Sequence, residues 1–168
     1  MLYTDAEGTG SLGAAAELPC GRVVYLRGRV PRKVKQMLSQ RKTNIVAFEL
    51  LAALVPFVAM RNTIVGHRVI HFIDNLAALA CVVRGFSKKE DLAALAGRLW
   101  FDAALLMLEY RAEYVPSHMN LADGPSRDDV SLLNSMGALE MNSWQFPVFS
   151  TGLGDWMESI GEAHRAVA

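Results

Sequence analysis

The chain has 168 residues, a hydrophobic fraction of 52% and a formal net charge of zero, with 17 basic and 17 acidic side chains. This composition excludes an intrinsically disordered chain and predicts a globular protein with a substantial core. The two cysteines match neither a disulfide framework nor a zinc-binding pattern, which favours a reducing compartment. The longest apolar stretch, residues 45–60, is too short to span a membrane. We therefore expect no membrane partner and an intracellular location, cytoplasmic or nuclear.

The first third of the chain predicts three antiparallel strands. Short segments rich in β-branched, aromatic or small apolar residues alternate with turns that contain glycine. The first of these segments ends on a carboxylate, Asp5. The expected strands are residues 2–5, 12–16 and 22–27, the last of them at an edge of the sheet.

The middle of the chain predicts helices around one buried strand. Residues 69–73 form an apolar run that is typical of a strand buried on both faces, and Asp74 follows it directly. The helix before this strand contains Pro56, which predicts a kink or an early end. Ser87 and Glu90 form a capping-box pattern that opens a later, long helix. The other expected helices are residues 34–39, 45–60 and 75–83.

The last part of the chain predicts a fifth strand at residues 111–115. It is followed by helical pieces at 121–127 and 129–137, then by an extended tail at 142–154 and a short terminal helix. This order of elements implies an α/β fold with a five-stranded mixed sheet, antiparallel in its first three strands and flanked by helices. We expect one domain over residues 1–130 and a partly helical C-terminal extension over residues 131–168.

Basic side chains are concentrated in one part of this neutral chain. Residues 22–42 hold eight of them and no acid, whereas the chain from Asp102 onward is acidic on balance. A local basic block predicts a surface for a polyanion such as a nucleic acid, and a merely solvated charged face is the alternative. The block consists of Arg22, Arg27, Arg29, Arg32, Lys33, Lys35, Arg41 and Lys42.

Four carboxylates stand at positions that could face one site. Asp5 and Asp74 end the first and fourth strands, and Asp123 follows the fifth. Glu49 lies among apolar residues of a helix, where an isolated charge is costly unless it is paired or bound to a cation. The alternative is that Glu49 lies on a narrow solvated stripe of that helix.

If the first and fourth strands are neighbours, Asp5 and Asp74 stand side by side. Like charges so close are unfavourable without a cation between them. Hard divalent ions prefer oxygen ligands, and two such ions about 4 Å apart can activate a water molecule and stabilise the leaving oxygen of a phosphodiester. The sequence therefore predicts that Asp5, Glu49, Asp74 and Asp123 together hold metal ions.

Four short motifs carry a resemblance to a known family. They are Tyr-Thr-Asp-Ala at residues 3–6, the helix around Glu49, Phe-Ile-Asp-Asn at residues 72–75, and Val-Pro-Ser-His-Met-Asn-Leu-Ala-Asp-Gly-Pro-Ser-Arg at residues 115–127. With these motifs, residues 1–130 resemble the ribonuclease H domain attached to retroelement reverse transcriptases. The resemblance is closest to the tyrosine-recombinase (DIRS-like) retrotransposons.

This resemblance implies a ribonuclease H-like fold and metal-dependent cleavage of the RNA strand in RNA–DNA hybrids. It implies two Mg²⁺ ions, for which Mn²⁺ can substitute, on Asp5, Glu49, Asp74 and Asp123, and products with 5′-phosphate and 3′-hydroxyl ends. The implied partners are the hybrid and a reverse transcriptase domain on the same chain. The implied contacts to the nucleic acid are Thr4, Asn75, Arg27, Arg29, Arg32, Lys33, Lys35, Arg41 and Lys42.

Several positions depart from the family's pattern. Tyr114 stands where the family usually has a histidine that helps the product leave, and His118 in the following loop is either its catalytic substitute or merely solvated. Glu7 replaces a common serine, and Ile73 replaces a frequent threonine. Two alternatives therefore stay open: a non-catalytic binding module with the same fold, and a DNA nuclease or transposase of the same superfamily.

Overall fold

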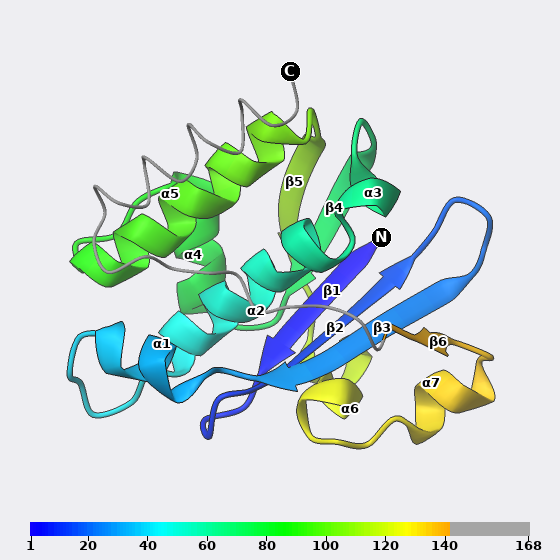
Figure 1. Cartoon of the computed structure of the whole chain (residues 1–168), viewed down its shortest axis with the longest axis horizontal. Coiled ribbons are helices and arrows are strands. Elements are labelled where there is room, and N and C mark those ends of the chain that lie inside the picture. Colours follow the sequence, from blue (N-terminus) through cyan, green and yellow to red (C-terminus); the bar gives the residue numbers. More distant parts are fainter. Residues whose placement is uncertain (142–168) are drawn as a thin grey trace.

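The computed structural model describes residues 1–141, and its centre is a six-stranded sheet in the order β5-β4-β1-β2-β3-β6 (Figure 1). The strands are β1 (Leu2–Ala6), β2 (Ser11–Glu17), β3 (Val23–Arg29), β4 (Arg68–Ile73), β5 (Glu109–Tyr114) and β6 (Leu139–Glu140). The helices are α1 (Arg32–Met37), α2 (Ile45–Ala59), α3 (Arg61–Ile64), α4 (Leu76–Arg84), α5 (Glu90–Leu105), α6 (Asp123–Ser126) and α7 (Ser131–Ser135), with a 3-10 turn η1 (Ser117–Met119). The tail and terminal helix predicted after residue 141 lie outside the described residues.

The sheet is mixed, as the order of elements predicts. Strands β1, β2 and β3 are antiparallel, and β4 pairs in parallel with both β1 and β5. Thr4 pairs with Ile73, so the carboxyl ends of β1 and β4 meet at the same edge of the sheet. The predicted fold class and the predicted neighbourhood of these two strands are therefore confirmed. The two-residue strand β6, parallel to β3, is an addition that the sequence did not predict.

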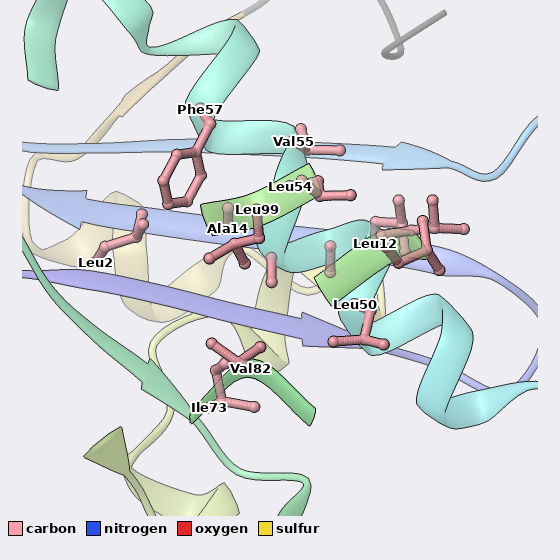
Figure 2. Packing of buried hydrophobic residues seen from close by; sticks show 14 of the residues in the cluster. Leu2, Leu12, Ala14, Leu50, Leu54, Val55, Phe57, Ile73, Val82 and Leu99 are labelled. Carbon is pink, nitrogen blue, oxygen red and sulfur yellow. The ribbon is translucent and has the colours of Figure 1, made fainter. Parts of the chain in front are cut away.

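Helices cover both faces of the sheet, but unequally. Helix α2 packs on β1 and β2 and against α4 and α5, whereas α6 packs on the opposite side of β1, β2 and β3 (Figure 1). Figure 2 shows Leu2 and Leu12 from the sheet, Leu54 and Phe57 from α2, and Leu99 from α5 within one cluster. The side chains of α2 are buried continuously from Ala47 to Phe57, so this helix runs through the core. Any polar group on that stretch is therefore removed from water when the protein folds.

Some details of the helices differ from the predictions. Helix α2 continues through Pro56 to Ala59, so the proline does not end it. Helix α5 begins at Glu90 without a side-chain cap, because the Ser87 hydroxyl accepts the N–H of Lys89 in a local turn instead of capping the helix. Helix α4 ends at Arg84, one residue beyond the predicted end, and Gly85 follows it in the left-handed conformation that glycine adopts at little cost.

Residues 131–141 pack on the same sheet. Leu133 of α7 is buried with Ala15 and Tyr25, and β6 extends the sheet beyond β3. The domain boundary predicted at residue 130 stays a prediction. Within residues 1–141, no helix is both long and apolar enough to cross a membrane.

Candidate metal centre

Three of the four predicted carboxylates meet at the carboxyl edge of β1 and β4. Asp5 comes from β1, Asp74 follows β4, and Glu49 comes from the buried helix α2. One carboxylate oxygen from each residue lies within 4.8 Å of those of the other two. Asp5 and Glu49 are buried and Asp74 is partly exposed, so the group opens to solvent at Asp74.

Glu49 is the most strongly perturbed of the three acids. Its side chain is buried, and its Oε2 atom has no hydrogen-bond partner among residues 1–141. Loss of water, with smaller contributions from the charges of Asp5 and Asp74, raises the pKa of Glu49 to about 9, although the backbone N–H of Ala6 donates to its carboxylate. The predicted solvated stripe is therefore excluded, and a buried carboxylate oxygen without a donor in the described part of the chain is suited to bind a cation.

Asp5 shows the same effect in a weaker form. Burial is the main cause that raises its pKa to about 6, with the charges of Asp74 and Asp123 adding to it. The hydroxyl of the buried Ser126 donates to Asp5 Oδ2 and opposes that rise, as does the charge of Arg127. Without a cation, a buried pair of acids of this kind is held partly protonated at neutral pH.

The donor set fits a hard divalent cation. All three groups offer carboxylate oxygens, the ligands that Mg²⁺ and Mn²⁺ prefer, and no sulfur or imidazole nitrogen of a described residue belongs to the group. The open side at Asp74 leaves room for the waters that Mg²⁺ retains. Asp5, Glu49 and Asp74 are thus suited to hold such an ion.

Asp123 lies next to this group but outside it. Its charge acts on Asp5, yet its Oδ1 atom accepts a hydrogen bond from Nε of Arg127 (3.0 Å) and lies 3.0 Å from Nη2 of the same guanidinium in an ion pair. The pair follows the i,i+4 spacing of a helical turn. The predicted fourth carboxylate therefore stands beside the site with a counter-ion of its own.

Two residues fix the loop that carries Asp123. Asn120 is buried, and its amide donates to the backbone oxygen of Thr4 (3.0 Å) and accepts from the N–H of Ala122 (3.1 Å). A Cβ atom at Gly13 would lie 2.5 Å from the backbone oxygen of Ala122, so only glycine lets α6 approach β2 this closely. Asn120, Ser126 and Gly13 are not among the predicted site residues, although the first two lie in the motif that carries the resemblance.

The hydroxyl of Thr4, a predicted nucleic-acid contact, lies inside the protein core. Thr4 is fully buried on the helix-covered face of β1, and its hydroxyl lies 2.7 Å from Nε2 of His71. Nδ1 of His71 lies 2.9 Å from the Tyr110 hydroxyl, and burial lowers the pKa of His71 to about 3. Thr4 therefore belongs to a neutral hydrogen-bonded chain inside the core. Asn75 is partly exposed and caps α4 through Oδ1, which leaves the donor end of its amide for a ligand.

The basic block divides into paired and unpaired residues. Arg27 pairs with Glu140 and Asp128, Arg29 pairs with Asp128, and Arg41 pairs with Asp91. Lys35 donates to the backbone oxygen of Thr9 and lies over the ring of Phe48. Besides Lys35, the members that make no ion pair with any described residue are Arg22, Arg32, Lys33 and Lys42, all of them exposed. Of these four, Arg22 donates a hydrogen bond to Sγ of Cys20.

Of the residues discussed with the departures from the family's pattern, Ile73 is buried in the core, whereas Tyr114, His118 and Glu7 are exposed. His118 is exposed in η1, and Tyr114 is exposed at the end of β5. Glu7 is exposed in the turn after β1 and accepts a hydrogen bond from Thr9 instead of joining the three acids. A hollow of about 350 Å³ lies at the opposite end of the sheet, lined by the first residues of β1 and β4, and contains none of these acids.

Comparisons with known proteins were made at the levels of sequence and structure. No protein-family model and no curated protein matches the chain. Among solved structures it is similar to the N-terminal RNase H domain of Rv2228c from Mycobacterium tuberculosis, determined as a fusion with maltose-binding protein. The two chains are 17% identical with a TM-score of 0.55, and the alignment covers 82% of this chain and 96% of the other. This chain therefore has a ribonuclease H-like fold.

Proposed function

We propose that this protein is a metal-dependent endoribonuclease that cleaves the RNA strand of RNA–DNA hybrids. The observation that supports the proposal most strongly is the convergence of Asp5, Glu49 and Asp74, with an unpartnered oxygen on Glu49. Such a group is stable in its charged form only with a cation between its members. The motifs at the ends of β1, β4 and β5 and the similarity to an RNase H domain support the hybrid as the substrate.

The proposed site holds two Mg²⁺ ions, for which Mn²⁺ can substitute. Asp5, Glu49 and Asp74 would hold the first, and Asp123, which pairs with Arg127 in this structure, would be a ligand of the second together with Asp5 or Asp74. When bound, the ions supply Lewis-acid activation of a water molecule and of the scissile phosphodiester. The protein contributes a rigid frame, because β1, β4 and α2 carry the ligands on packed elements of the core.

The proposed nucleic-acid contacts are exposed or partly exposed side chains outside the group of three acids. Arg32, Lys33 and Lys42 are the proposed contacts to phosphates of the DNA strand, since their charges are not neutralised by described residues. The amide nitrogen of Asn75 is the proposed contact to a 2′-hydroxyl, the group that distinguishes RNA from DNA. His118 is exposed in η1 and is proposed to assist product release.

The motif from Asn120 to Arg127 supports a retroelement origin. We propose that the chain is part of, or derived from, a retroelement reverse transcriptase and works in the cytoplasm or the nucleus. A polymerase domain on the same chain would then share the bound hybrid.

A substrate panel tests the proposal. End-labelled RNA–DNA hybrid, RNA duplex and DNA duplex are incubated with Mg²⁺, Mn²⁺ or EDTA. We expect only the RNA strand of the hybrid to be cut, only with metal, and with 5′-phosphate and 3′-hydroxyl ends. Equal cutting of the DNA duplex would assign a DNA nuclease or transposase instead. Binding of the hybrid by the folded protein, without cleavage in either metal, would assign a non-catalytic module.

A further inference from the structure

The Ser126 hydroxyl is a buried group that bridges α6 and the metal centre. Ser126 is fully buried, and its Oγ donates to Asp5 Oδ2. The backbone oxygen of Asp123 lies 2.9 Å from the same hydroxyl. A serine has one proton to donate, and a carboxylate is a stronger acceptor than a peptide oxygen. The hydrogen bond to Asp5 is therefore the dominant one when Asp5 is ionised.

The backbone brings this hydroxyl to Asp5 through Gly13. Gly13 is the direct neighbour of Asp5 across the β1–β2 ladder, so both residues face α6. A Cβ atom at Gly13 would lie 2.5 Å from the backbone nitrogen of Ser126 and 2.9 Å from the side chain of Pro125. Because Gly13 has no side chain, α6 packs directly against β2. This close packing brings the Ser126 hydroxyl within hydrogen-bonding distance of the Asp5 carboxylate on the neighbouring strand β1.

We propose that Ser126 is a positioning residue for Asp5, one that holds Oδ2 so that the other carboxylate oxygen faces Glu49 and Asp74 as a metal ligand. This inference rests on the proposed metal-dependent function and adds a residue that does not itself touch the ion. A carboxylate held at one oxygen has lost the rotation that would otherwise oppose ion binding. Hydrogen-bond partners of metal ligands typically change metal affinity by about 10- to 100-fold when they are removed.

The test compares Ser126→Ala and Ser126→Cys with the full-length wild type. Cysteine nearly preserves the buried volume but donates weakly, and Mn²⁺ has little preference for its sulfur. Ser11→Ala is the matched control, because Ser11 is also a buried serine of this sheet but contacts Thr9 and not the acids. Mn²⁺ affinity is measured by calorimetric titration at one pH, and kcat and KM are measured on the hybrid.

We expect both Ser126 variants to bind Mn²⁺ about 10-fold or more weakly. At an Mn²⁺ concentration that saturates only the wild type, kcat should fall while KM for the hybrid is unchanged, and Ser11→Ala should match the wild type. Wild-type affinity in a folded Ser126→Ala or Ser126→Cys protein would overturn the inference. If neither variant folds, the hydroxyl serves the fold and the positioning role is overturned. A wild type that binds no Mn²⁺ would contradict the proposed function itself, and the inference with it.

Discussion

Replacing Glu49 with Gln removes a group whose ionisation opposes folding in the metal-free protein. Burial raises the pKa of Glu49 from 4.5 to about 9. Between these two values the folded state keeps a proton that the unfolded state releases, so the free energy of unfolding falls as pH rises. The contribution of the protonated Glu49 to the free energy of unfolding is fully present below pH 4.5 and is lost progressively as the pH rises towards 9.

The size of this effect follows from the shift. Within the window, one such group lowers the free energy of unfolding by about 1.4 kcal/mol for each pH unit. From pH 6.5 to 8.5, the wild type in EDTA should therefore lose about 3 kcal/mol. Asp5 contributes little to this loss between pH 6.5 and 8.5, because burial raises its pKa only from 3.8 to about 6. Its own effect on the free energy of unfolding is therefore confined mainly to lower pH.

Urea unfolding at several pH values in EDTA measures the slope. Glu49→Gln should nearly abolish it between pH 6.5 and 8.5. Glu109→Gln, which changes an exposed acid at the far end of β5, should leave it as in the wild type. Saturating Mg²⁺ should also flatten the wild-type slope, since the ion binds the ionised acids of the folded state. A flat wild-type profile in EDTA, or an equal slope in Glu49→Gln, would refute the assignment of Glu49 as a buried, unpaired acid.

Three further predictions concern the surroundings of the site. Gly13→Ala should lower the free energy of unfolding by about 1–3 kcal/mol in urea, because its Cβ would press on α6; an unchanged midpoint would contradict this close packing. Asn120→Ala removes two buried hydrogen bonds and should cost about 2 kcal/mol in the same assay, and a loss below about 0.5 kcal/mol would show that the loop does not depend on them. In hybrid binding measured against salt concentration, Arg32→Ala should lower the slope of log affinity by about 1, whereas Arg29→Ala should not, because Asp128 already pairs with Arg29. Equal effects of the two substitutions would argue against Arg32 as a specific phosphate contact.

Local patterns in the sequence were sufficient to predict most of the fold and to identify the three acids that converge at one edge of the sheet. The apolar run before Asp74 and the turn after Asp5 define strands by their own composition, and both strands occur where predicted. Glu49 was recognisable because a charge within a continuously apolar helix has no solvated face. These arguments need only the spacing of residues along one element.

The partners of the basic block could not be predicted in this way. Arg27 is paired with Glu140, 113 residues away, and Arg41 with Asp91, 50 residues away. Such pairs depend on how distant segments pack, which the local charge pattern does not contain. The burial of the Thr4 side chain could not be predicted for a similar reason, because it depends on which face of β1 the helices cover.

The interaction that separates Asp123 from the other acids had a signal in the sequence. Arg127 follows Asp123 at the i,i+4 spacing that forms ion pairs on a helix, and the structure contains that pair. The prediction treated Asp123 only as a metal ligand and did not consider this nearer partner.

The most direct test of the central claim is metal-dependent cleavage of a labelled RNA–DNA hybrid by the wild type, Asp74→Asn and Glu109→Gln. Asp74→Asn removes one carboxylate charge from the group of three, at its solvent-exposed side, with almost no change in shape. We predict that wild type and Glu109→Gln cut the RNA strand in Mg²⁺ or Mn²⁺, and that Asp74→Asn folds but does not cut. Cleavage by a pure Asp74→Asn protein at the wild-type rate would contradict a metal centre built on Asp5, Glu49 and Asp74.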